Sequence, residues 1–117
     1  MNIEELQQLC TSFPGVIQDI KWESHLCFNV SDKLFMITSP DELPVSASFK
    51  VSEEDFLKLS ERAGCEPAPY LARYKWIRIE DISLFSKSEW EYYAYNAYKL
   101  ISLKLSKKKR EELGISD

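Results

Sequence analysis

The chain has 117 residues, of which 44% are hydrophobic and 29% charged, and its net charge is −4. This length fits one domain, and the composition argues against a disordered or fibrous chain. No run of about 18 apolar residues is present, which excludes a transmembrane helix, and the acidic N-terminus does not resemble a signal peptide. The three cysteines are widely spaced, so we expect free thiols and a cytoplasmic protein that does not contact membranes.

Charge is unevenly divided along the chain. Residues 1–57 carry 3 basic and 10 acidic residues, a net charge of −7, whereas residues 58–110 carry 12 basic and 6 acidic residues, a net charge of +6. Residues 111–117 add −3. This asymmetry fits either a solvated, salt-bridged surface or a basic surface that binds an anionic partner.

The first predicted element is a helix that begins after Asn2, a favourable N-terminal cap. Apolar residues recur at helical spacing as far as Cys10. The helix should end at Phe13-Pro14-Gly15, because proline disfavours helix before it and glycine permits a reversal.

A strand region follows the first helix. Alternating apolar and polar residues and a polar turn at residues 31–33 indicate antiparallel hairpins. The predicted strands cover residues 16–22, 26–30, 34–38 and 45–51.

A second helix is predicted from the capping residue Ser52 to about Ala63, with Phe56, Leu57 and Leu59 facing inward. Beyond it, a proline-rich loop over residues 67–70 precedes one helical turn at residues 71–74. A further alternating strand is predicted over residues 76–80.

The last and longest helix is predicted to begin at a capping box formed by Ser86 and Glu89. Its apolar residues continue at helical spacing to Leu105. Basic residues at or beyond its C-terminal end suit the helix dipole.

These elements predict an α+β fold. Consecutive strands with short turns indicate a single antiparallel sheet of about four to six strands, with helices packed on one face and the other face open to water. We expect one domain over residues 1–117, with a core over about 1–110 and a short C-terminal tail at 111–117.

No motif for catalysis is apparent. His25 is the single histidine, the cysteines lie among apolar neighbours, and no glycine-rich phosphate-binding motif is present. We therefore expect no enzymatic activity, no cofactor and no metal site.

Two groups of residues are candidates for a binding surface. On the open face of the sheet, alternation places Trp76 and Arg78 outward from one strand and Lys50 outward from another. Trp76 could stack on a nucleic-acid base or cover an apolar partner. The alternative is that the loop over residues 67–74 covers Trp76.

The second group is a basic run near the C-terminus, joined to the first by residues before the last strand. These cations could contact phosphates, or they could simply complement the helix dipole. The complete candidate set for nucleic-acid binding is Lys50, Arg73, Lys75, Trp76, Arg78, Lys107, Lys108, Lys109 and Arg110.

The order and spacing of several sequence pieces resemble the MmcQ/YjbR family of small bacterial proteins. The pieces are Phe13-Pro14-Gly15-Val16, residues 28–35, residues 47–51, Pro67-Ala68-Pro69-Tyr70-Leu71-Ala72-Arg73-Tyr74-Lys75-Trp76, Glu80-Asp81, and residues 89–110. The chain departs from many members in having Ala97 before Tyr98 and no glycine in the turn at 31–33, neither of which is a candidate binding residue.

This resemblance implies a CyaY-like (frataxin-like) fold and a DNA-binding role without catalysis. DNA would be contacted through the open sheet face and the basic end of the last helix. The alternative is a non-enzymatic module that binds a protein or a small ligand through the Trp76 face. Frataxin-like iron binding is less favoured, since the first helix offers only Glu4 and Glu5. We expect a monomer or a weak homodimer.

Overall fold

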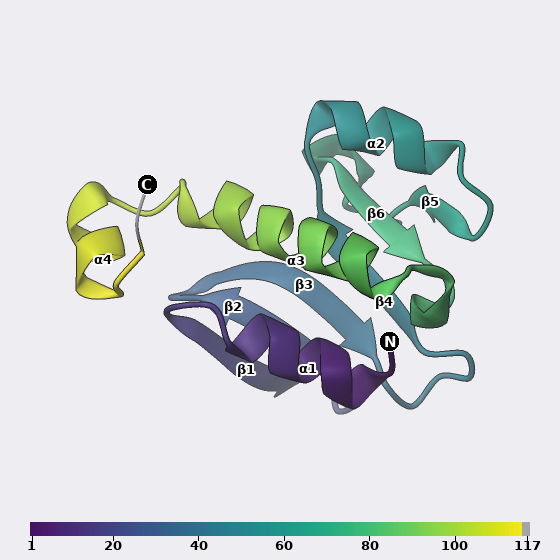
Figure 1. Cartoon of the computed structure of the whole chain (residues 1–117), viewed down its shortest axis with the longest axis horizontal. Coiled ribbons are helices and arrows are strands. Elements are labelled where there is room, and N and C mark those ends of the chain that lie inside the picture. The colour runs from purple at the N-terminus through teal and green to yellow at the C-terminus, as the bar shows by residue number, and fades with distance from the viewer. Residues whose placement is uncertain (116–117) are drawn as a thin grey trace.

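The computed structural model describes residues 1–115 as a six-stranded antiparallel sheet with helices on one face (Figure 1). The predicted α+β class is thereby confirmed. In chain order the elements are α1 (Ile3–Thr11), β1 (Val16–Lys21), β2 (His25–Val30), β3 (Lys33–Ser39), β4 (Ser46–Lys50), α2 (Glu53–Ser60), β5 (Cys65–Pro67), the 3-10 turn η1 (Ala72–Tyr74), β6 (Trp76–Ile79), the 3-10 turn η2 (Ile82–Leu84), α3 (Lys87–Ser102) and α4 (Lys107–Glu112).

The strands lie in the order β1-β2-β3-β4-β6-β5. β1 to β4 form a meander, and β6 pairs with β4 on one side and with β5 on the other. β1 and β5 are therefore the two edges of the sheet. The connection from β4 to β6 passes through α2 and β5, which brings residues 46–50 beside residues 76–79.

Helix starts follow the capping residues in the sequence. Asn2 and Ser86 each form a complete capping box, with Glu5 and Glu89 as the reciprocal partners. Ser52 accepts a hydrogen bond from the Asp55 backbone N–H and so caps α2. All three predicted starts are confirmed.

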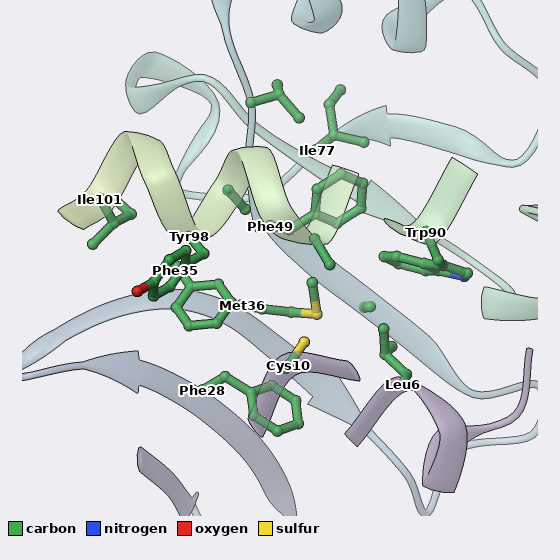
Figure 2. Close-up of a cluster of buried hydrophobic side chains, with 14 of the residues drawn as sticks. Leu6, Cys10, Phe28, Phe35, Met36, Phe49, Ile77, Trp90, Tyr98 and Ile101 are labelled. Carbon is green, nitrogen blue, oxygen red and sulfur yellow. The ribbon is translucent and has the colours of Figure 1, made fainter. Parts of the chain in front are cut away.

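α3 crosses the sheet and supplies the largest side chains of the core. Figure 2 shows Trp90 and Tyr98 of α3 among phenylalanines from the strands. The Phe49 ring centroid lies 5.4 Å from that of Trp90, and the Phe35 ring centroid lies 5.8 Å from that of Tyr98, both edge-on. α1 closes the cluster from its other side with Leu6 and Cys10.

Three details differ from the sequence prediction. β5 is too short to give an alternating pattern, and Leu57 is exposed on α2 rather than inward. The long helix ends at Ser102, and a separate helix, α4, is capped by Ser106, which accepts a hydrogen bond from the Lys109 N–H at 3.1 Å. Helical spacing at Leu105 was misleading, because this buried leucine lies in the connection between the two helices.

Candidate nucleic-acid interface

The end of β4 and the segment before β6 hold two of the candidate cations together. Lys50 lies opposite Trp76 in the β4–β6 register, and the Val51 N–H donates to the Lys75 carbonyl at 2.9 Å. The Lys50 Nζ donates to the carbonyl of Tyr74. The sheet itself therefore fixes Lys50 against the segment that contains Lys75.

The charge of a third lysine, Lys104 in the connection between α3 and α4, also acts on Lys50. Burial lowers the pKa of Lys50, and the positive charges of Lys104 and Lys75 lower it further. Three cations from three separate parts of the chain thus lie close enough to repel one another. Glu53 acts on Lys50 in the opposite direction, but the positive charges outnumber it, so the local charge favours an anion.

The segment before β6 also presents aromatic side chains to solvent. Tyr70 is 99% exposed, and Tyr74 is exposed as well. The guanidinium of Arg73 lies 4.7 Å from the centroid of the Tyr74 ring, and its Nη2 donates to the Tyr74 hydroxyl at 2.7 Å. We name residues 70–75 the Tyr70–Lys75 loop.

Sequence reasoning missed Tyr70 and Tyr74 as candidate binding residues. The sequence feature that could have indicated them is the rigid Pro67-Ala68-Pro69 run before Tyr70, together with the helical turn that follows. The exposure of Tyr70 depends on its left-handed backbone, with φ of +65°, which periodicity does not reveal.

Of the two alternatives for Trp76, the structure supports the one in which the preceding loop covers it. Its position opposite Lys50 is as predicted, but only 6% of the residue is exposed. The loop before β6 packs against Trp76. Ala68 is buried, and the Ala68 N–H donates to the Trp76 carbonyl at 2.9 Å. Trp76 therefore belongs to the packing beneath this loop and is not available to stack on a base or to form an apolar docking face.

Arg78 lies on the open sheet face between two glutamates. Its guanidinium is 3.6 Å from Glu42 and 3.5 Å from Glu66. A small hollow of about 110 Å³ beside it is lined in part by Glu80. Acidic side chains thus outnumber the single arginine here, and the local charge does not favour an anionic ligand.

The basic run forms α4, which extends beyond the sheet at one end of the molecule (Figure 1). Lys107 and Lys108 are exposed, and Lys109 lies 3.9 Å from Glu112. Arg110 donates to the Leu105 carbonyl at 2.7 Å and so stabilises the α3–α4 connection. The candidate residues therefore fall into three groups: Lys50 with the Tyr70–Lys75 loop, Arg78 on the open sheet face, and the basic residues of α4. Lys104 lies in the connection that precedes α4.

Other reactive groups offer little chemistry. Burial raises the pKa of Cys10 to about 12 and also raises the pKa values of Cys27 and Cys65 above their ordinary range. His25 is half-buried, and its ring lies edge-on to Trp22 at 5.8 Å. Within residues 1–115, no three histidine, cysteine, aspartate or glutamate side chains converge as metal ligands, and no helix is long and apolar enough to cross a membrane.

Comparison with known proteins gives the family. Residues 11–100 match the YjbR family, and the chain belongs to it. The fold is shared with the Deinococcus radiodurans protein DR2400, a DUF419 protein, at a TM-score of 0.88 and 20% identity over 99% of this chain and 90% of that one. A protein from Pseudomonas syringae aligns at a TM-score of 0.71 and 19% identity over 86% of this chain and 99% of that one. No curated protein matches significantly.

Proposed function

We propose that the protein is a cytoplasmic, non-enzymatic DNA-binding protein that contacts its ligand through the Tyr70–Lys75 loop. The supporting observation is that Lys50 donates to the Tyr74 carbonyl in that loop and is under the influence of the positive charges of Lys75 and Lys104. Clustered lysines release counterions from the phosphate backbone when they bind it, so a local cluster can bind DNA despite a net charge of −4.

The exposed tyrosines favour single-stranded DNA over a duplex. In a single strand the base faces are accessible, and stacking of one base on an aromatic side chain contributes about 1–3 kcal/mol. Tyr74 accepts a hydrogen bond from Lys50 through its carbonyl, and Tyr70 is exposed in the same loop. Phosphates would therefore contact the lysines while bases stack on the rings. Lys107 and Lys108 would extend the contact along the strand.

The test is the affinity for a fluorescent single-stranded oligonucleotide, measured by anisotropy at several salt concentrations. We expect Lys104→Glu to weaken binding and to reduce the slope of log K against log salt by about 0.7 per lost phosphate contact. The matched control is Lys87→Glu, the same charge change at the opposite end of α3, roughly 25 Å away along a helix of this length. The control should leave the slope unchanged.

Two further measurements separate the roles of charge and stacking. Tyr70→Ala should weaken binding about tenfold with no change in salt slope, since it removes a stacking ring and no charge. Duplex DNA of the same length should bind more weakly than the single strand. Absence of binding at about 50 mM salt, or equal effects of Lys104→Glu and Lys87→Glu, would overturn the proposal.

A further inference from the structure

The outer edge of the sheet at β1 exposes apolar side chains. Ile17 and Ile20 of β1 are 59% and 58% exposed, and Trp22, in the turn after the strand, is 66% exposed. Among residues 1–115, no strand follows β1 on its outer side. The opposite edge, β5, is short and ends at Pro67, which removes a donor and discourages pairing. β1 has six residues and no proline.

The side chains of β1 alternate between the two faces of the sheet in a known register. Asp19 lies opposite Cys27, on the open face, and Lys21 projects to the same face. The charges of Asp19 and Lys21 both act on the Cys27 thiol, which agrees with this placement. Ile20 lies opposite the core residue Leu26 and so belongs to the helix-covered face.

Residues 19–21 of β1 are complementary to themselves when reversed. We propose that two copies of the chain pair antiparallel through β1, with the twofold axis at Ile20, and form a continuous twelve-stranded sheet. In this register Ile20 faces Ile20 of the second copy. Asp19 faces Lys21 of the second copy, and Lys21 faces Asp19. Both oppositely charged pairs lie on the open face, where directly opposed cross-strand charges attract.

Trp22 follows β1 in the turn at residues 22–24, where its φ is +51°, so the strand residues that pair in this register are Asp19, Ile20 and Lys21. Gln18 and Ile20 line a hollow of about 430 Å³ between α1 and β1, and the Gln7 amide donates to the Gln18 amide oxygen at 2.6 Å across it. The turn that contains Trp22 of the second copy would lie beside this hollow. The pairing therefore covers Ile20 and forms an isologous contact that closes as a dimer.

The proposal is independent of DNA binding. β2, β3 and β4 separate β1 from β6, which follows the Tyr70–Lys75 loop, so pairing at β1 leaves the loop accessible. A single pair of edge strands is a small interface, so we expect a weak dimer.

Sedimentation velocity over about 10–500 µM of the full chain tests the dimer by the rise of the weight-average sedimentation coefficient. Asp19→Lys places a lysine opposite Lys21, and Lys21→Asp places an aspartate opposite Asp19. Each change should weaken the dimer about tenfold, since two attractive pairs become repulsive. Circular dichroism of each variant confirms that the monomer is folded.

Two combinations of these variants should restore the attractive charge pairs and therefore the dimer. The double variant Asp19→Lys/Lys21→Asp restores both pairs and should dimerise like the natural chain. An equimolar mixture of the two single variants should form a heterodimer, because every charge then faces its opposite. Equal behaviour of the single and double variants, or absence of the heterodimer, would overturn the register.

A cross-link tests the axis directly. Ile20→Cys places two cysteines directly opposite each other, within the Cα separation of about 4.4–6.8 Å that a disulfide spans. Mild oxidation should give a covalent dimer. Gln18→Cys is the control, because its two copies would be about 13 Å apart along the paired strands and should not cross-link. A monomer at every concentration and no cross-link at Ile20→Cys would refute the proposal.

Discussion

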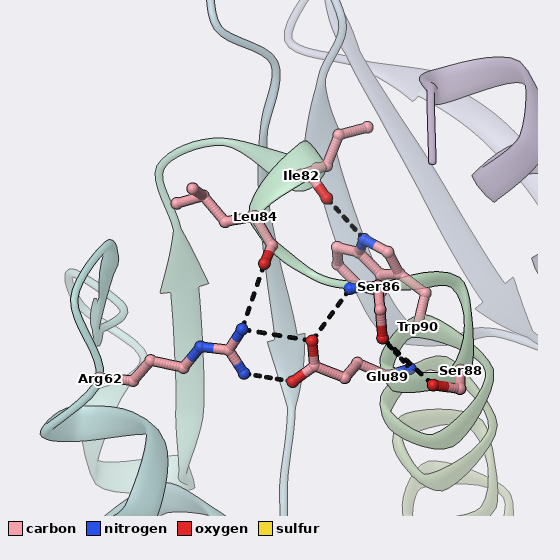
Figure 3. A network of polar contacts seen from close by, with 7 residues as sticks. All are labelled: Arg62, Ile82, Leu84, Ser86, Ser88, Glu89 and Trp90. Carbon is pink, nitrogen blue, oxygen red and sulfur yellow. Dashed lines mark hydrogen bonds and ion pairs between the residues drawn. The ribbon is translucent and has the colours of Figure 1, made fainter.

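Glu89 connects three segments of the chain through one carboxylate (Figure 3). It accepts a hydrogen bond from the Ser86 N–H at 2.9 Å, which completes the cap of α3, and it binds the guanidinium of Arg62 with both oxygens. Arg62 in turn donates to the Leu84 carbonyl at 3.1 Å and lies 4.7 Å from the centroid of the Phe85 ring. The region after α2, η2 and the start of α3 are thus joined at one point.

This arrangement predicts a defined acid sensitivity. The hydrogen bonds from Arg62 lower the pKa of Glu89 from its ordinary 4.5 to about 2. The stabilisation is therefore complete above pH 4.5 and is lost as the pH falls toward 2, because only the unfolded state takes up the proton in that range. Glu89→Gln should reduce the free energy of unfolding at pH 7 by about 1–2 kcal/mol, allowing for partial solvent screening.

Urea unfolding at pH 7 and pH 3 measures this effect. The difference between the natural chain and Glu89→Gln should shrink at the lower pH. Glu91→Gln, on an exposed position of the same helix, is the control and should change little at either pH. A constant difference at both pH values would contradict the role assigned to the carboxylate.

At the scale of elements, the turn between α1 and β1 is the place where the C-terminal part of the chain docks. The Tyr98 hydroxyl donates to the Pro14 carbonyl at 2.6 Å. Gly15 has a φ of +79°, and a Cβ there would lie 3.1 Å from the Cβ of Leu113. The Phe13-Pro14-Gly15 sequence therefore has two roles. It ends α1, and its lack of a side chain at Gly15 leaves room for Leu113 after α4.

Gly15→Ala and Gly114→Ala separate the two costs of a side chain at such positions. Both glycines have φ near +80°, but a Cβ at Gly114 would have nothing within 4 Å. Gly114→Ala should therefore cost only the backbone strain, about 1–2 kcal/mol. Gly15→Ala should cost about 1 kcal/mol more, because Leu113 must move. Thermal unfolding compares the two, and equal losses would show that Leu113 is loosely packed.

The elements also show where sequence reasoning is strong and where it ends. The helix starts at Asn2, Ser52 and Ser86 were predictable because capping depends on neighbouring residues alone. The strands of the meander were predictable because alternating apolar and polar residues indicate a half-buried sheet. The sequence left the burial of Trp76 as one of two alternatives, because it depends on a loop folding back over the strand. The position of Lys104 relative to Lys50 and Lys75 was also not predictable. The three lysines come from distant segments, and no pattern within a single segment indicates such a cluster.

At the scale of the whole molecule, the sheet depends on α3 for its core. Trp90 and Tyr98 are fully buried, and they pack against phenylalanines from β3 and β4. A fragment of residues 1–86 would retain all six strands but leave this apolar face uncovered. Because apolar burial is the dominant favourable term in folding, the fragment should not fold cooperatively.

Far-UV circular dichroism and binding of the dye ANS test this prediction. We expect no cooperative thermal transition for residues 1–86 and strong dye fluorescence from the exposed face. Addition of a peptide covering residues 87–117 should restore the transition if the two parts reassociate. A sharp transition of the fragment alone would show that the sheet holds its own core.

The strand order also has a consequence for the chain as it leaves the ribosome. β1 to β4 emerge in the order in which they pair. The side of β4 that pairs with β6 stays unpaired until β6 is synthesised, about 25 residues later by the spacing of the two strands. During that interval the unpaired edge of β4 is a second open edge, opposite β1. A nascent chain is then open to strand exchange with its neighbours at two places, and synthesis of residues 76–79 closes one of them.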